Sequence, residues 1–387
     1  MNLVQQLGTN RRVFLKRLGS FNERSDFFAV QRYFEKIYAL HYTYIGWRDR
    51  ALWYLYRALY GLIYLTYVHK TYWVLTNWKG NLNSATNVLG VLWFFSAVIL
   101  RVAILEWHYP LLAQLQAFLN DHSYQRGDPW SNESRSQFYR RSNRVTLAVM
   151  AVNFAEIVCF ATTNVLTLED FMLQYQGRIV GRWPLQIAYG VITMCWGATY
   201  CLGFLICYLI MATFKMEIDI LLHSFEELGR NLRLQNPVSN LQKLKAIINP
   251  IAFVQYYSTY LVLADCCLIL ATGEMSSYSI VYVISMLVFL TEAYLLCRGV
   301  ENLRNLKPRI AAALYDFDWT LQLVKPAGYR SDAQYRHVRR TFLLITAHSG
   351  QMIRFSFAGI GEISMNSFSE LLEKSYSMLT FLLQFAK

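Results

Sequence analysis

The sequence predicts an all-α membrane protein with seven transmembrane helices, a cytosolic N-terminus and an extracellular C-terminus. Of its 387 residues, 55% are hydrophobic and only 16% are charged, whereas soluble chains carry about 25% charged residues. Apolar stretches recur along the chain, and most approach the roughly 20 residues that a helix needs to cross a bilayer. These two observations predict the fold class, and the distribution of basic residues predicts the orientation.

Seven apolar stretches are the expected spans. The fourth is longer than the others, and the first and last carry charged residues. They are residues 51–67, 85–105, 146–166, 185–214, 251–271, 278–297 and 364–385. The chain therefore divides into a cytosolic or interfacial region at 1–50, six spans within 51–297, a cytosolic anchor region at 298–350 and the last helix within 351–387.

Basic residues gather on one side of these spans. The segments on the N-terminal side hold 28 Lys and Arg residues, whereas those on the opposite side, with the C-terminal tail, hold 5. Because basic loops stay in the cytosol, this asymmetry places the N-terminus inside. An odd number of spans then places the C-terminus outside. The net charge of +12 is explained by this topology, so we expect a lipid bilayer and no nucleic acid as partner.

The inner segments are also the long ones. The fourth span continues over residues 214–231 as an amphipathic pattern, which needs a partner. A helix resumes after Asn236-Pro237 and leads into the fifth span, and the sixth is expected to extend inward as far as Pro308. These extensions predict a packed cytosolic layer where subunits meet. Solvated connecting helices are the alternative.

The last stretch carries a polar stripe when it is placed on a helix at about 100° per residue. One bulky apolar residue, Phe381, lies within the stripe. A membrane helix must turn a polar face toward protein or water. We therefore expect a pore-lining helix with Phe381 as a hydrophobic gate that closes by dewetting, while packing of the stripe against other helices is the alternative. The other pore residues on our list are Gln384 and Phe385 at the outer mouth, Thr380 and Ser377 beneath, and Glu373 and Glu370 at the inner end.

Two stretches near the C-terminus resemble insect odorant receptors. Residues 312–319 read Ala-Ala-Leu-Tyr-Asp-Phe-Asp-Trp, and residues 372–377 read Leu-Glu-Lys-Ser-Tyr-Ser. The second is similar to the Leu-x-x-Ser-Tyr-Ser pattern on the last helix of that family. The end of the chain also resembles the Thr-Tyr-five-apolar-Gln-Phe signature of insect gustatory receptors. It departs there because Ser377 and Met378 replace Thr and Tyr, and Thr380 interrupts the apolar five.

The resemblance implies an insect chemoreceptor channel fold and an odorant-gated, non-selective cation channel. In that family four subunits surround a pore lined by the last helices, and odour-tuned subunits work with a shared co-receptor. The implied partners are a small volatile odorant, the co-receptor and permeant cations, in the plasma membrane of an olfactory sensory neuron. The alternatives are a gustatory receptor channel or, in another class, a seven-span G-protein-coupled receptor.

The resemblance also implies an odorant pocket in the outer halves of the second, third, fourth and sixth spans. Such a pocket needs mostly apolar walls with few polar groups, and plain packing is the alternative for any one of its aromatic residues. The candidates are Val88, Val91, Leu92, Phe95, Met150, Phe154, Ile157, Tyr189, Ile192, Trp196, Tyr278 and Tyr282.

Five charged residues lie inside apolar stretches: Arg57, Arg101, Glu156, Asp265 and Glu292. Charged residues at membrane depth usually face the bundle interior and have partners. We expect a structural ion pair for each, with Glu156 and Asp265 near the pocket.

An enzyme has no support in the sequence. It holds no phosphate-binding loop and no supported Ser-His-Asp arrangement. The seven cysteines show no metal-ligand spacing. We therefore expect no catalytic residues, no metal and no cofactor.

Epitope tags at the two termini test the orientation. In intact cells an antibody should label a C-terminal tag and should label an N-terminal tag only after permeabilisation, because the basic segments hold the N-terminus inside. Labelling of the N-terminal tag on intact cells would instead indicate the topology of a G-protein-coupled receptor.

Overall fold

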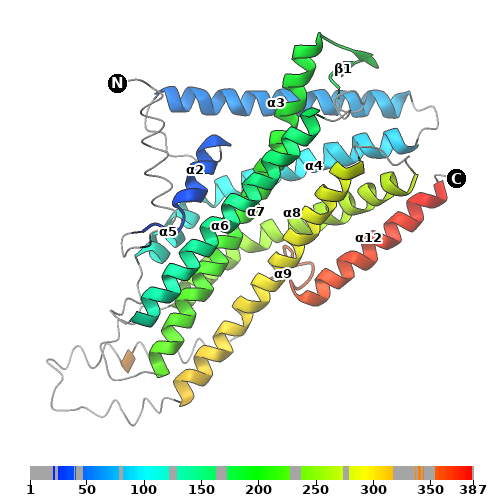
Figure 1. Cartoon of the computed structure of the whole chain (residues 1–387). Helices are drawn as coiled ribbons and strands as arrows, with labels where there is room; N and C mark the ends of the chain where they lie inside the picture. Colours follow the sequence, from blue (N-terminus) through cyan, green and yellow to red (C-terminus); the bar gives the residue numbers. More distant parts are fainter. Residues whose placement is uncertain are drawn as a thin grey trace.

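The part of the chain that the structure describes is a bundle of long helices (Figure 1). The computed structural model describes residues 21, 25–38, 40, 47–77, 82–121, 129–162, 172–226, 237–272, 279–316, 336, 339–340, 343 and 354–385. Its elements are α2 (Ala29–Ile37), α3 (Trp47–Thr76), α4 (Leu82–Trp107), α5 (Tyr109–Asn120), α6 (Pro129–Thr162), β1 (Gln174–Tyr175), β2 (Arg178–Ile179), α7 (Trp183–Glu226), α8 (Pro237–Thr272), α9 (Ser279–Asp316) and α12 (Met365–Phe385).

Every predicted span overlaps one of these helices. By length and composition, four described segments are apolar enough to cross a membrane: Ser84–Trp107, Trp183–His223, Asn240–Thr272 and Tyr282–Ala313. The stretches expected to form the first, third and seventh spans lie on α3, α6 and α12. The third was expected to reach residue 166, and its last part lies outside the described residues. The number of helices that cross the bilayer stays a prediction.

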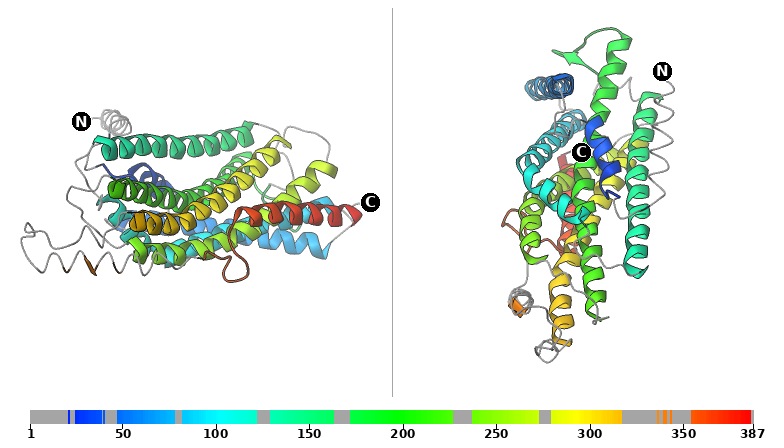
Figure 2. Two further views of the ribbon diagram at one scale, coloured as in Figure 1. Left: turned by 90° about the horizontal axis from the view of Figure 1, so that it is seen from below. Right: turned by 90° about the vertical axis from the view of Figure 1, so that its left-hand side faces the viewer.

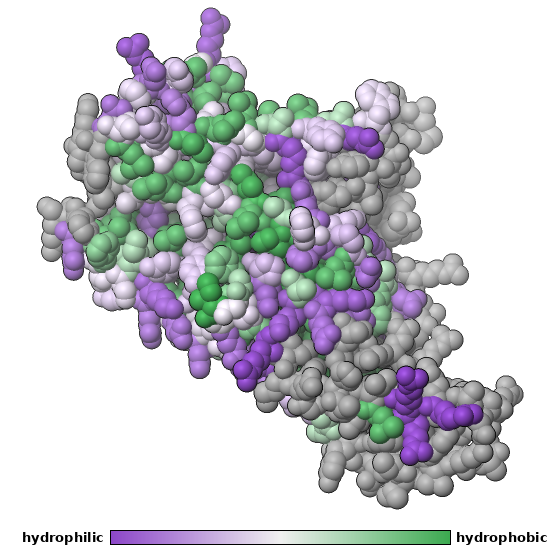
Figure 3. All heavy atoms as spheres, turned by 180° about the vertical axis from the view of Figure 1, so that it is seen from behind, coloured by the Kyte–Doolittle hydropathy of each residue, from purple (hydrophilic) through white to green (hydrophobic). Residues whose placement is uncertain are grey.

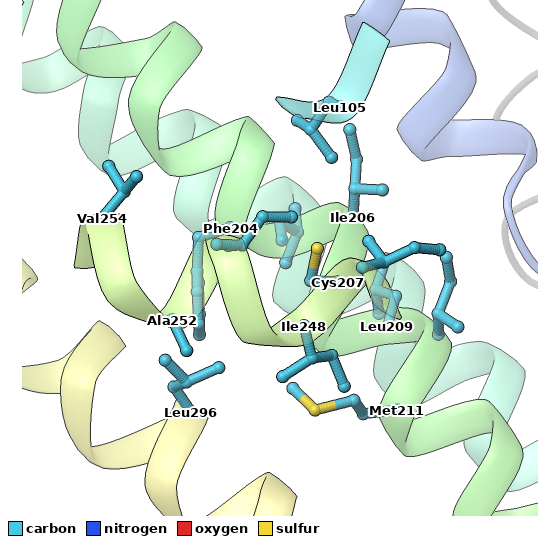
Figure 4. Packing of buried hydrophobic residues seen from close by; sticks show 14 of the residues in the cluster. Leu105, Phe204, Ile206, Cys207, Leu209, Met211, Ile248, Ala252, Val254 and Leu296 are labelled. Atoms are coloured by element: carbon cyan, nitrogen blue, oxygen red, sulfur yellow. The ribbon is translucent and has the colours of Figure 1, made fainter. Parts of the chain in front are cut away.

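Helix α7 forms the centre of the bundle. Of its most apolar window 83% is buried, compared with 33% for that of α9. It packs against α4, α6 and α9, while α12 packs on α8 and α9. Figure 2 shows α6, α7 and α9 running side by side. Figure 4 shows the core where α7 meets its neighbours, with Phe204, Leu209 and Met211 of α7 beside Ile248 and Ala252 of α8, Leu105 of α4 and Leu296 of α9.

Two helices continue beyond their apolar spans, as the sequence predicts. Helix α7 continues the predicted fourth span as far as Glu226, and residues 227–231 lie outside the described part. Helix α9 does not stop at Pro308 but runs on to Asp316. A proline inside a helix removes one backbone hydrogen bond. The packing of Leu306 and Ile310, at 0% and 1% exposure on either side of Pro308, holds the helix together there.

A two-stranded hairpin, β1–β2, precedes α7 and was not expected from the sequence. Gln174 pairs with Ile179 and Tyr175 with Arg178. The two turn residues, Gln176 and Gly177, have φ angles of 50° and 73°, as the tightest hairpin turns require. Tyr175 stacks on His69 of α3 with ring centroids 5.0 Å apart, so the hairpin lies against the end of that helix.

A buried network around Arg101 joins four helices. Its guanidinium donates to the backbone carbonyl of Tyr200 (2.8 Å) on α7, to Glu292 (3.4 Å) on α9 and to the side-chain oxygen of Gln255 on α8. The guanidinium carbon also lies 3.5 Å from the ring centroid of Tyr200. Gly203 makes room for the arginine stem, because a Cβ there would lie 2.9 Å from the Cδ of Arg101. The expected pairing of Arg101 and Glu292 is therefore present.

Two further ion pairs fix neighbouring helices. Arg135 of α6 donates twice to Glu217 of α7, at 2.9 and 2.8 Å, and both side chains are buried. Arg57 of α3 pairs with Glu106 of α4 at a half-exposed position. The Arg135–Glu217 pair is two-pronged, and such bidentate Arg–carboxylate pairs are among the stronger polar contacts in proteins.

The segment before α12 is a compact turn anchored to two helices. Phe355 and Ile363 pair across it, and Ala358 and Gly359 adopt positive φ angles. Asn249 of α8 accepts a hydrogen bond from the backbone of Ser356 at 3.1 Å. Arg304 of α9 binds Glu362 at 2.9 Å. These contacts fix the starting point and direction of the last helix.

Arg101→Met tests the central network. It leaves Glu292 buried without its cation, and breaking a buried pair costs about 3–5 kcal/mol. We expect a large fall in the thermal midpoint of the purified protein and in its surface level. Arg57→Met is the control, because a partly exposed pair contributes at most about 1 kcal/mol. Equal midpoints for the two variants would contradict this account, and the double change Arg101→Met with Glu292→Leu should recover part of the loss.

Candidate functional site

A partly open cavity of about 140 Å³ lies between helices of the bundle. Five helices line it: α4, α6, α7, α8 and α9. The lining residues are Asn87, Gly90, Val91, Phe94, Phe95, Asn153, Glu156, Thr193, Met194, Gly197, Tyr200, Cys201, Val262, Asp265, Cys266, Tyr282, Ser285, Val288 and Phe289. Most are apolar or aromatic, as in sites that bind small molecules.

The aromatic wall of the cavity rests on the Arg101 network. The Tyr200 ring lies 5.4 Å from that of Phe94 and 4.9 Å from that of Phe289, measured between centroids. The Tyr200 hydroxyl bonds to Ser258 at 2.8 Å. Arg101 contacts both the ring and the backbone carbonyl of Tyr200. This wall is therefore fixed before any ligand enters.

The polar groups in the cavity are few and mostly paired. Ser285 donates to Glu156 at 3.1 Å, and Tyr282 donates to Asn87 at 2.9 Å. Asp265 differs, since its Oδ1 is shielded from solvent and has no hydrogen-bond partner among the described residues. Glu156 and Asp265 were expected to form ion pairs, and that expectation is wrong for the described part of the chain, where no cation lies within ion-pair distance of either.

A second, larger hollow lies between α6, α7 and α9, with a volume of about 520 Å³. Its walls include Arg141, Lys215, Asp219 and Arg298. These charged side chains make it unlike an apolar odorant pocket, and Lys215 and Asp219 are already paired at 2.7 Å.

Three of the residues expected to bind the ligand line the smaller cavity: Val91, Phe95 and Tyr282. The others that the structure describes lie outside it. Val88, Met150, Tyr189 and Trp196 are buried in other contacts, Leu92, Ile157 and Ile192 are half-buried, and Phe154 is 67% exposed on the surface of α6. Tyr278 lies outside the described residues.

The sequence interpretation missed the wall contributed by α8. Val262, Asp265 and Cys266 come from the predicted fifth span, which we had not assigned to the pocket. The carboxylate of Asp265 within an apolar stretch was the available signal, and we expected it near the pocket but as half of an ion pair.

The polar stripe of α12 points away from its own subunit. Asn366, Glu370, Glu373, Ser377 and Gln384 are exposed, Thr380 is half-buried and Phe381 is 51% exposed. Nothing is described of the Phe385 side chain. The other side of the helix is buried against α8 and α9 through Ser367, Leu371 and Ser375, which are at most 8% exposed. The hydroxyl of Ser375 donates to the carbonyl of Tyr260 at 3.4 Å.

Apolar side chains cover wide parts of the molecular surface, as Figure 3 shows for one face. The exposed large hydrophobic residues include Leu62 and Leu65 of α3, Phe154 of α6 and Leu287 of α9, each at least 55% exposed. Contiguous apolar surface of this kind indicates contact with lipid or another subunit. Together, the helical bundle, its apolar exterior and its partly open aromatic cavity are typical of a membrane protein with room for a small molecule.

The profile of the family described as 7tm Odorant receptor matches residues 81–376. The chain therefore belongs to the insect odorant receptor family, whose members are ligand-gated channels and not enzymes. This match confirms the resemblance seen in the C-terminal motifs. No curated protein matches the chain.

Two solved structures share the fold. One is the olfactory receptor OR5 from Machilis hrabei, with a TM-score of 0.60 and 12% identity over 92% of this chain and 98% of that one. The other is the same receptor in complex with eugenol, with a TM-score of 0.60 and 15% identity over 96% of this chain and 98% of that one. At these identities the similarity establishes the fold alone.

Gly90→Ala tests the cavity. A Cβ at Gly90 would overlap Oδ2 of Asp265 and lie 2.7 Å from its Cγ, so the carboxylate must shift into the cavity, and overpacking costs about 1–3 kcal/mol. We expect a lower thermal midpoint and weaker odorant-evoked responses. The control is Gly61→Ala on α3, where a Cβ meets nothing within 4 Å. Equal effects of both changes would contradict the assignment.

Proposed function

We propose that this chain is an odour-tuned subunit of an odorant-gated, non-selective cation channel. It crosses the plasma membrane of an olfactory sensory neuron seven times, with its N-terminus in the cytosol, and forms a tetramer with the family's co-receptor. Four copies of α12 surround the pore. The observation that carries this proposal is the exposure of the polar stripe on the side of α12 that faces away from its own subunit.

The stripe's exposure favours a water-filled pore over packing within the subunit. A polar helix face in a membrane needs water or protein as its partner. Glu370 and Glu373 at one end would attract cations, with Lys374 partly offsetting them. The ammonium of Lys374 lies 3.3 Å from the Tyr256 hydroxyl and 3.5 Å from Glu370, at the border between the stripe and α8.

A small odorant binds in the cavity formed by α4, α6, α7, α8 and α9. Its size and aromatic walls support a small organic ligand, and a receptor of the same fold has been solved in complex with eugenol. Val91, Phe95 and Tyr282 would contact the ligand. Trp196 would support these walls, because its ring lies 4.6 Å from that of Phe95.

Helices α8 and α9 connect the cavity to the pore helix. On α8, Val262 and Asp265 line the cavity while Tyr260 contacts Ser375 of α12. On α9, Phe289 lines the cavity while Tyr294 lies against Phe368 of α12, with ring centroids 5.8 Å apart. A ligand that binds the open arrangement of these helices more tightly shifts the equilibrium toward it. Phe381 then leaves the axis and hydrated cations pass.

Phe381→Ala tests the gate. Removing the apolar ring lowers the barrier that dewetting imposes, so ligand-free current should rise, or channel block should change, in cells that express the chain with an insect co-receptor. Whole-cell recording with matched surface expression provides the measurement.

Leu372→Ala is the control for the gate. This residue lies nine positions earlier, about half a turn around α12 from Phe381 at 100° per residue, and it is 41% exposed. It should leave ligand-free current unchanged. Unchanged current and block in Phe381→Ala would remove Phe381 from the gate, whatever the result for Leu372.

A further inference from the structure

The cavity holds two carboxyl groups and no basic side chain. Glu156 enters from α6 and Asp265 from α8, and no Lys, Arg or His belongs to the cavity wall in the part of the chain that the structure describes. Two other buried acids of the bundle have cations, since Glu292 binds Arg101 and Glu217 binds Arg135. In the described wall of the cavity, by contrast, negative charge exceeds positive charge.

Asp265 lacks a partner that its position requires. Its Oδ1 is shielded from solvent and has no hydrogen bond from any residue that the structure describes. Burying a polar group without a hydrogen bond costs free energy, and a buried carboxylate costs more unless it is paired. The other oxygen, Oδ2, lies against the backbone of α4 at Gly90. The backbone of α4 thus holds Oδ2 in place. Asp265 lines the cavity, so its Oδ1 can accept a hydrogen bond from a ligand there.

The rest of the cavity suits the body of a small cation. The rings of Phe94, Tyr200 and Phe289 supply π faces, which attract ammonium groups within about 6 Å. Arg101 does not compete for the carboxylates, since it is already bound to Glu292, Gln255 and Tyr200. A volume of about 140 Å³ is close to the roughly 150 Å³ of an apolar cavity that binds benzene.

We propose that the cavity selects small volatile amines, whose ammonium group donates a hydrogen bond to Oδ1 of Asp265. Glu156 contributes a second negative group, and the hydrocarbon body packs against Phe94 and Phe289. Aliphatic amines are protonated at neutral pH, as the lysine side chain is. This assignment of the ligand class rests on the proposed function, in which the same cavity binds the activating odorant.

Matched ligands test the amine class. Cyclohexylamine, cyclohexanol and methylcyclohexane share one ring and differ in the substituent. In cells that express the chain with an insect co-receptor, we expect the amine to evoke current at a half-maximal concentration about tenfold or more below that of the alcohol, because hydrogen bonds to charged groups contribute about 1.5–3 kcal/mol. The hydrocarbon should be weakest.

Two substitutions locate the contact. Asp265→Asn should raise the half-maximal concentration of the amine about tenfold or more while leaving that of the alcohol nearly unchanged. Glu156→Gln should raise it by a smaller factor. Glu133→Gln, at an exposed position of α6 that lies outside the cavity, is the matched control and should change neither. Equal loss for amine and alcohol in Asp265→Asn would overturn the contact.

A binding measurement separates this inference from the proposed function. The thermal midpoint of the purified wild-type receptor should rise more with cyclohexylamine than with cyclohexanol. An equal or smaller rise overturns the amine class without bearing on the channel. The converse outcome is a larger rise with the amine for a chain that reaches the cell surface but in which none of the tested ligands evokes a current. That outcome supports the amine site and overturns the proposed channel function.

Discussion

The rest of the structure depends on one buried cation. Arg101 on α4 reaches α7, α8 and α9 through Tyr200, Gln255 and Glu292, so a single guanidinium fixes the relative position of four helices. An arginine at membrane depth is costly unless it is paired and hydrogen-bonded. The terminal nitrogens of Arg101 have these partners, while its Nε has none among the described residues. The acceptors must stay within reach of the guanidinium, which limits how those helices can rotate or slide. Gly203 contributes by leaving space for the arginine stem.

This network ties the site to the scaffold. Tyr200 is held by Arg101 on one side and lines the cavity with Phe94 and Phe289 on the other. The cavity walls formed by α8 and α9 continue into the two helices on which α12 packs. In the proposed function, a rigid centre beside a small cavity would let ligand binding act on α8 and α9 without repacking the core. The turn anchored by Asn249 and Arg304 transmits the position of these helices to the start of α12.

The contrast between the two kinds of buried acid bears on specificity. Glu292 and Glu217 are bound by arginines and serve the fold, whereas Glu156 and Asp265 face a cavity without a cation. A polar group within a mostly apolar cavity is the place where discrimination between ligands is expected to be strongest. A site built to bond a donor rejects an analogue that lacks it, because its own polar group is then left unpaired.

The sequence by itself determined the helices and the amphipathic face of α12. Apolar length predicts a helix wherever backbone groups must be satisfied internally, and the spacing of Glu370, Ser377 and Gln384 at three to four residues defines a stripe without reference to any neighbour. The tertiary structure alone decided how each helix is rotated. Helices such as α4 and α7 are apolar on all sides, so periodicity cannot tell Phe95, which lines the cavity, from Val88, which does not. The pairing of Arg101 with Glu292 across 191 residues, and the absence of a cation beside Asp265, depend on that rotation.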